Sequence, residues 1–231
     1  MVLFACQKPS NNKKTTQQTT IHESADGSQK NAAKEKYSKF TPVILGKLSS
    51  IDTLQIDLDK SQISWIGRKV TGEHSGSLLL SNGWVVMDKN ILIGGKFIFD
   101  MSSISNKDIE SPEWRLKLEE HLKSEDFFNV DSFPIAILEI KDHQPLSDDP
   151  SASNNQLLAD LTIRGIKQEL SFPISLQQSD AIFLAEGIVD IDRTLYNIQY
   201  KSGKFIEDLG DKLIYDDFTV QFMVQTEGNK K

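Results

Sequence analysis

The chain contains one cysteine, Cys6, in 231 residues, so no intramolecular disulfide framework can hold its fold together. It also lacks any apolar run approaching the ~20 residues that a membrane-spanning helix requires. Hydrophobic residues make up 38% of the composition, which is enough for a substantial core. The length fits one large all-β domain or two small domains.

Acidic residues outnumber basic residues outside the N-terminal region. Residues 1–40 hold seven lysines against three acidic residues, a net charge of +4, which leaves −11 for the remainder because the whole chain carries −7. Nucleic-acid phosphates require clustered Lys and Arg side chains. We therefore do not expect nucleic acid as a partner.

The sequence offers no catalytic or metal-binding constellation. Its four histidines, His22, His74, His121 and His143, are scattered, without an HExxH motif or a pair at i, i+4. No serine elbow, phosphate-cradling loop or cysteine nucleophile is present. We expect no catalytic residue, no metal and no cofactor, and predict a protein that is not an enzyme. His121 is interpreted as a helix residue packing against a rim, and His74 as a turn residue.

Residues 111–134, SPEWRLKLEEHLKSEDFFNVDSFP, predict one amphipathic helix. Four residues recur at helical spacing on one face: Trp114, Leu118, His121 and Leu122. Ser111 and Pro112 suit the N-cap and the first helical position. The adjacent rings of Phe127 and Phe128 follow the helix. We predict that this segment caps one mouth of a β structure, with the two rings as a wedge.

The remainder of residues 51–227 reads as strands in which apolar and polar residues alternate. Asn82-Gly83 predicts a hairpin turn between SLLL and WVVM. About eight strands with one apolar face each are near the number at which a closed barrel leaves room for side chains or one small ligand. The alternation favours antiparallel strands, and closure removes exposed edges. We predict an all-β, antiparallel closed barrel.

The predicted inner wall is apolar and partly aromatic. Its residues are Trp65, Phe97, Phe99, Leu161, Ile163, Phe172, Val189 and Ile191. A hollow barrel of this kind encloses a cavity of roughly 300 to 1,000 Å³ and binds an apolar ligand through buried area, at roughly 25 cal/mol per Å². The alternative is a barrel packed solid, which would serve as a protein-interaction module with an acidic surface.

Arg193 extends the apolar face of its predicted strand by one step, so it points inward or sits at the rim. One interpretation is a contact for a polar head group, such as a pyrophosphate or a quinone oxygen. The other is a structural ion pair with a carboxylate of the barrel.

The N-terminal region has a different character. Leu3-Phe4-Ala5-Cys6 resembles the end of a bacterial lipoprotein signal, in which the cysteine is lipidated, although no basic segment and little apolar sequence precede it. The polar residues that follow predict a disordered tether over residues 1–50. Cys6 would then anchor the protein to a membrane. The alternative is a lone thiol in a disordered tail.

Six motifs in order resemble the bacterial YceI-like family over about residues 55–225. They are W-x-G, G-E-H-S-G, G-G-K-F-x-x-D-M-S-S-I, H-L-K-S-x-D-F-F-x-V-x-x-F-P, L-x-A-D-L-T-I-R-G-I and D-I-D-R-T-x-Y-N-I-x-Y-K-S-G-K-F. H-L-K-S-x-D-F-F and L-T-I-R-G are the more specific elements. Two residues depart from the family pattern: Asn197 and Lys201 stand where the family commonly has glycine.

The resemblance implies a lipocalin-like antiparallel barrel, usually exported to the periplasm, that binds an apolar isoprenoid lipid such as a polyprenyl chain or a quinone. Members of the family are generally not enzymes. With Cys6 lipidated, the protein would be anchored to the outer membrane. The sequence leaves a homodimer open.

Overall fold

The computed structural model describes residues 51–88, 91–146, 155–179 and 182–228. The elements in chain order are β1 (Ile51–Gln55), β2 (Gln62–Lys69), β3 (Gly72–Asp88), β4 (Ile91–Asn106), α2 (Pro112–Lys123), β5 (Ile135–Pro145), β6 (Asn155–Ile163), β7 (Ile166–Ser179), β8 (Ile182–Asp192), η1 (Arg193–Tyr196), η2 (Gly210–Lys212) and β9 (Ile214–Gln225). Cys6 and the predicted tether lie outside the described residues. Within the described ranges, no helix is long and apolar enough to cross a bilayer.

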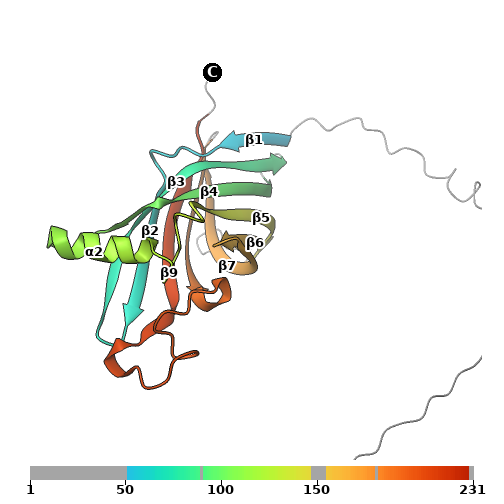
Figure 1. Ribbon diagram of the computed structural model, residues 1–231. Helices are drawn as coiled ribbons and strands as arrows, with labels where there is room; N and C mark the ends of the chain where they lie inside the picture. Colours follow the sequence, from blue (N-terminus) through green and yellow to red (C-terminus); the bar gives the residue numbers. More distant parts are fainter. Residues whose placement is uncertain (1–50, 89–90, 147–154, 180–181, 229–231) are drawn as a thin grey trace, which may run out of the picture. The chain divides into compact units, whose positions relative to one another are not determined.

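The strands form a closed antiparallel barrel (Figure 1). The sheet order is β1-β3-β2-β9-β8-β7-β6-β5-β4, and β3 also pairs with β4. Strands β2 to β9 therefore close on themselves, and β1 extends the ladder along the end of β3. This confirms the predicted barrel of about eight strands with one amphipathic helix.

The hairpin predicted at Asn82-Gly83 is wrong. Strand β3 runs unbroken through this dipeptide, and Asn82 and Gly83 pair with Ile98 and Phe97 of β4. Pairing with β4 on both sides of the dipeptide holds this part of β3 extended, and this outweighs the local turn signal. Gly83 instead permits close packing, because a Cβ at this position would lie 3.0 Å from the Ile56 side chain.

Alternation along the strands directs apolar side chains inward and charged side chains outward. In β6, for example, Ala159, Leu161 and Ile163 are buried. The outer face of β4 to β7 carries a ladder of ion pairs: Lys96–Glu139, Lys167–Glu139, Lys167–Asp160, Lys141–Asp160 and Lys141–Glu169. Such exposed pairs add little stability, but a slip of one residue would bury their charges, so they fix the strand register.

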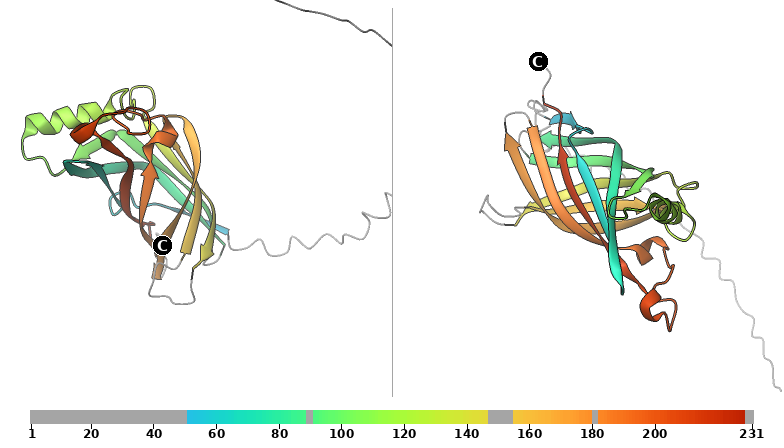
Figure 2. Two further views of the ribbon diagram at one scale, coloured as in Figure 1. Left: turned by 90° about the horizontal axis from the view of Figure 1, so that it is seen from below. Right: turned by 90° about the vertical axis from the view of Figure 1, so that its left-hand side faces the viewer.

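Helix α2 lies against the β4 side of one barrel end and extends away from the barrel (Figure 2). None of its residues is buried, and Trp114 is 62% exposed. Ser111 occupies the N-cap position, but its side chain makes no capping hydrogen bond. Leu122, in the last turn, packs against the core. After the helix the chain turns back to the barrel, where Phe127 and Val130 are buried.

Candidate functional site

The barrel is hollow. It encloses a cavity of about 230 Å³ whose wall is formed almost entirely by apolar side chains from every barrel strand. For comparison, an apolar cavity of about 150 Å³ in another protein stays dry and binds benzene. The volume lies just below the range of roughly 300 to 1,000 Å³ that is usual for ligand pockets. The solid barrel considered as an alternative is therefore not what this chain forms.

The structure brings together all eleven residues that the sequence predicted as ligand contacts. They line the cavity: Trp65, Phe97, Phe99, Phe127, Phe128, Leu161, Ile163, Phe172, Val189, Ile191 and Arg193. Successive side chains of a strand point to opposite faces of the sheet. The strand residues in this set occupy the positions that point into the barrel. Their contact with a ligand stays a prediction.

The residues at one end of the cavity were not predicted. It is formed by Ile56, Met87, Leu92 and Phe183, all of which are buried. A β-bridge joins Ile56 to Thr226 at this end, and Thr226 Oγ1 accepts a 2.9 Å hydrogen bond from the backbone N–H of Phe183. Met87 follows Val85 by two positions in β3, so both side chains point into the barrel. Strand alternation would have identified Met87 if residues 72–88 had been predicted as a single strand.

The opposite end, the mouth, is covered by an aromatic cluster of His121, Phe127 and Tyr200. The His121 ring meets the Phe127 and Tyr200 rings edge-on at centroid distances of 5.0 and 4.8 Å, and the latter two rings are 5.4 Å apart. Beside this cluster, the Phe128 ring meets the Phe218 ring of β9 at 6.2 Å. The predicted double-aromatic wedge is therefore present at the mouth.

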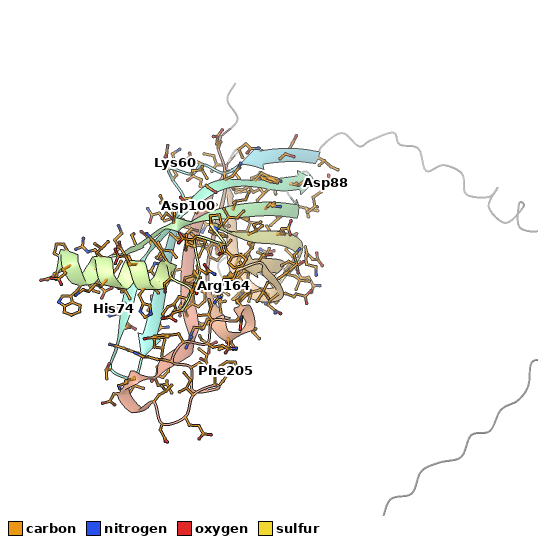
Figure 3. All side chains as sticks on the ribbon, in the orientation of Figure 1. Lys60, His74, Asp88, Asp100, Arg164 and Phe205 are labelled. Carbon is orange, nitrogen blue, oxygen red and sulfur yellow. The ribbon has the colours of Figure 1, made fainter. Side chains whose placement is uncertain are left out.

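Arg164 ties the segments of the mouth together. It lies in the two-residue turn between β6 and β7, where Arg164 and Gly165 have φ values of 51° and 72°. This turn requires positive φ at both positions. Arg164 Nη1 donates to the backbone oxygens of Phe127 and Asn197, both at 2.9 Å. One guanidinium (labelled in Figure 3) thus joins the β6–β7 turn to the Phe127 segment and to the loop after η1.

Arg193 is buried, and its side chain is only 5% exposed. Its nitrogens donate to the backbone oxygens of Tyr215, Ile198 and Ile214 at 2.9 to 3.1 Å, and Nη2 lies 3.3 Å from Asp216 Oδ1. Burial lowers the pKa of Arg193, although Asp216 opposes this change. The ion pair of the structural interpretation is thus present, and most guanidinium donors are engaged by protein oxygens. A contact to a ligand head group stays a prediction.

Asp192 anchors the loop that follows β8. Its carboxylate accepts hydrogen bonds from the N–H and Oγ1 of Thr194 at 2.8 and 2.6 Å, and from Lys204 Nζ at 2.7 Å. Burial alone would raise the pKa of Asp192, but the hydrogen bonds from Lys204 and Thr194 outweigh it, so the pKa is lowered. The carboxylate therefore stabilises this loop in its ionised form.

The two departures from the family pattern both lie in this loop at left-handed backbone positions. Asn197 has φ 59° and Lys201 has φ 49°. Glycine adopts this conformation at no steric cost, Asn tolerates it, and a long side chain such as Lys is less favourable there. The loop backbone therefore adopts the left-handed conformation that favours glycine at both positions, although neither residue is glycine.

His74 is not a turn residue. It lies within β3, and its Nδ1 is 2.8 Å from Asp108 Oδ2. Asp108 also accepts hydrogen bonds from Ser75 N and Asn106 Nδ2. Burial alone would raise the pKa of Asp108, but the hydrogen bonds from His74, Ser75 and Asn106 outweigh burial, so the pKa is lowered. In the part of the chain that the structure describes, no group of three or more His, Cys, Asp or Glu side chains is arranged to hold a metal.

The fold and the site define a closed antiparallel barrel around an apolar cavity, with an aromatic cluster across one mouth. The model of the YceI-like domain matches residues 54–226, and the chain belongs to this family. A comparison with curated protein sequences finds no match.

The solved structures that are similar to this chain include BcnA and a polyisoprenoid binding domain. BcnA from Burkholderia cenocepacia is 18% identical with a TM-score of 0.58, and the match covers 74% of this chain and 99% of BcnA. A polyisoprenoid binding domain from Saccharophagus degradans, implicated in plant cell wall breakdown, is 11% identical with a TM-score of 0.56, and the match covers 78% of this chain and 99% of that domain. At these identities the likeness shows a shared fold.

Proposed function

We propose that the protein binds and carries an apolar isoprenoid lipid, of polyprenyl or quinone type, inside the barrel and within the bacterial cell envelope. The observation that carries this proposal is the enclosed cavity with its apolar wall. Membership of the YceI-like family supports it, as does the fold shared with a polyisoprenoid binding domain.

The cavity dimensions suit a slender hydrocarbon. At about 230 Å³ the cavity is larger than the cavity of about 150 Å³ that accommodates benzene in another protein. Burial of such a chain is favourable by roughly 25 cal/mol per Å² of apolar surface and needs few hydrogen bonds. An apolar tail therefore enters the barrel, and any charged head group stays at the mouth, because an unpaired buried charge is costly.

Entry and release require the mouth to open. Phe127 lines the cavity and also belongs to the aromatic cluster. Each strand around the cavity is paired with a neighbour on both sides. The cluster is held by ring contacts, by hydrogen bonds from Arg164 and by the turn that follows α2. The mouth is thus the weaker part of the enclosure, and the ligand passes there.

Filling the cavity tests the binding role. Ala136 on β5 lines the cavity, whereas the preceding residue, Ile135, faces outward and is exposed. Ala136→Phe places a ring in the space for the ligand, and Ile135→Phe adds a ring outside it. We expect geraniol affinity, measured by calorimetry, to fall at least ~10-fold only in Ala136→Phe. Equal affinities in the two variants, with both shown to be folded by thermal unfolding, would contradict the proposal.

The envelope location rests on the sequence of the N-terminal region, and it includes anchoring through lipidated Cys6. Cell fractionation of the full chain and of Cys6→Ser tests it. We expect the wild-type protein in the membrane fraction and the variant in the soluble fraction of the envelope. If the two proteins have the same distribution, the proposed anchoring through Cys6 is contradicted, and Cys6 is a lone thiol.

A further inference from the structure

The loop between η1 and β9, residues 197–213, carries two exposed apolar side chains at the mouth end of the barrel. Phe205 and Ile206 are adjacent in this loop and are 51% and 44% exposed. We call this pair the loop tip. Figure 1 shows the loop at the end of the barrel opposite to β1, and Figure 3 labels Phe205 on it.

The loop is joined directly to the cover of the cavity. Tyr200 belongs to the aromatic cluster, and Arg164 Nη1 donates to the Asn197 oxygen at 2.9 Å. The Ile214 N–H donates to the Lys201 oxygen at 3.0 Å, which ties the loop to β9. A surface that receives the loop tip therefore lies beside the mouth through which the ligand passes.

The turn that carries the loop tip is closed by its own hydrogen bonds. The backbone N–H groups of Phe205 and Ile206 both donate to the Ser202 oxygen, at 3.2 and 3.0 Å. Ser202 is 0% exposed, and its Oγ accepts from the Lys204 N–H at 3.2 Å. Amide groups that already have acceptors avoid the penalty that unpaired amide groups have in hydrocarbon. The tip thus presents apolar side chains on a backbone whose N–H groups need no water.

The charges around the loop tip favour a lipid surface of little net charge. The loop holds three lysines and three acidic residues, whereas the chain after residue 40 carries a net charge of −11. A strongly anionic surface would repel this acidic body, and zwitterionic headgroups would not. Glu207 and Asp208 follow the tip directly. Their carboxylates stay at the level of the headgroups, which limits the tip to shallow insertion.

We propose that the loop tip inserts shallowly into a zwitterionic lipid bilayer and docks the mouth of the barrel on the membrane that supplies or receives the ligand. The inference rests on the proposed function, because an isoprenoid lipid resides in a bilayer before and after its carriage. Burial of the Phe205 and Ile206 side chains supplies the attraction. Two side chains give weak, reversible attachment, which suits a carrier that has to leave the membrane again.

Binding to phosphatidylcholine vesicles tests the inference. Every protein is the full chain with Cys6→Ser, so that no lipid anchor contributes. We expect the Cys6→Ser protein to float with the vesicles. Adding Phe205→Ser or Ile206→Ser should lower its partition coefficient at least ~5-fold, because apolar area that enters the interface is lost. Neither residue lines the cavity, so geraniol affinity should be unchanged in both variants.

Ile188 supplies a matched control. It lies in the middle of β8 on the outer wall of the barrel and is 57% exposed. Ile188→Ser makes the same chemical change as Ile206→Ser, and we expect it to leave vesicle binding unchanged. Fluorescence gives a second readout: phosphatidylcholine with brominated acyl chains should quench Phe205→Trp more strongly than the Cys6→Ser protein, which is the blank for the three native tryptophans.

The outcomes separate this inference from the proposed function. A Cys6→Ser protein that binds geraniol but no vesicles would overturn the docking and keep the cavity. Equal losses in Ile206→Ser and Ile188→Ser, or binding only to vesicles of anionic phosphatidylglycerol, would also overturn docking through the loop tip. Vesicle binding that is reduced only in the tip variants, with no geraniol bound by any of the proteins, would keep the tip as a membrane contact and overturn the proposed function.

Discussion

The indole ring of Trp65 occupies the space that a side chain at position 76 would need. A Cβ on Gly76 would lie 2.5 Å from Cζ2 and 2.6 Å from Cε2 of Trp65. The two residues pair directly across β2 and β3, and Trp65 lines the cavity. Its Nε1 is the one buried side-chain nitrogen or oxygen in the described ranges without a hydrogen-bond partner. Glycine at position 76 therefore fixes the position of one aromatic wall.

Gly76→Ala should lower the free energy of unfolding by about 3 kcal/mol, because the new methyl group overlaps the Trp65 ring and the Ser105 carbonyl. Gly94→Ala is the control, because no atom lies within 4 Å of its Cβ position. We expect that control to change stability by less than about 1 kcal/mol. Chemical denaturation measures both. Similar values for the two variants would contradict the close approach.

Arg193→Ala should lower the free energy of unfolding by about 3 kcal/mol, because it removes the side-chain donor from three backbone oxygens and leaves Asp216 only its longer contact with Lys204. Arg193→Lys should restore only part of this loss, since an ammonium cannot reach all four oxygens. An alanine variant as stable as the wild type would contradict the structural role. Geraniol affinity of the folded variant then decides the second role: unchanged affinity leaves Arg193 structural only.

The lowered pKa of Asp192 predicts a loss of stability in acid. The folded state holds the carboxylate ionised more strongly than the unfolded state does, so the contribution is complete above the ordinary value of 3.8 and is lost as pH falls through the lowered pKa. Asp192→Asn lacks this carboxylate. The free energy of unfolding should therefore fall less steeply below pH ~4 in the variant than in wild-type protein. Parallel pH profiles would show that Asp192 does not contribute.

The barrel and its wall could be predicted because strand alternation assigns each residue to a face. Phe97, Leu161 and Val189 come from different strands, yet each has the inward phase and reaches the same cavity. Alternation alone does not determine whether the interior is filled, since that depends on the packed volumes of side chains from all strands.

The strand at Asn82-Gly83 and the course of the apolar face of α2 escaped prediction for different physical reasons. The turn signal of Asn82-Gly83 is local, whereas the pairing of these residues with β4 is a long-range contact that only the closed barrel reveals. Helical periodicity identified the apolar face of α2 but not its destination. Leu122 reaches the cavity, while Trp114 is 62% exposed.

Organic extraction of the protein purified from its native cells, followed by mass spectrometry, tests the central claim most directly. The account predicts an isoprenoid lipid in near-stoichiometric amount from wild-type protein and little or none from Ala136→Phe, whose added ring fills the cavity. Wild-type protein that yields no apolar lipid, or that yields the same amount as Ala136→Phe, would contradict it.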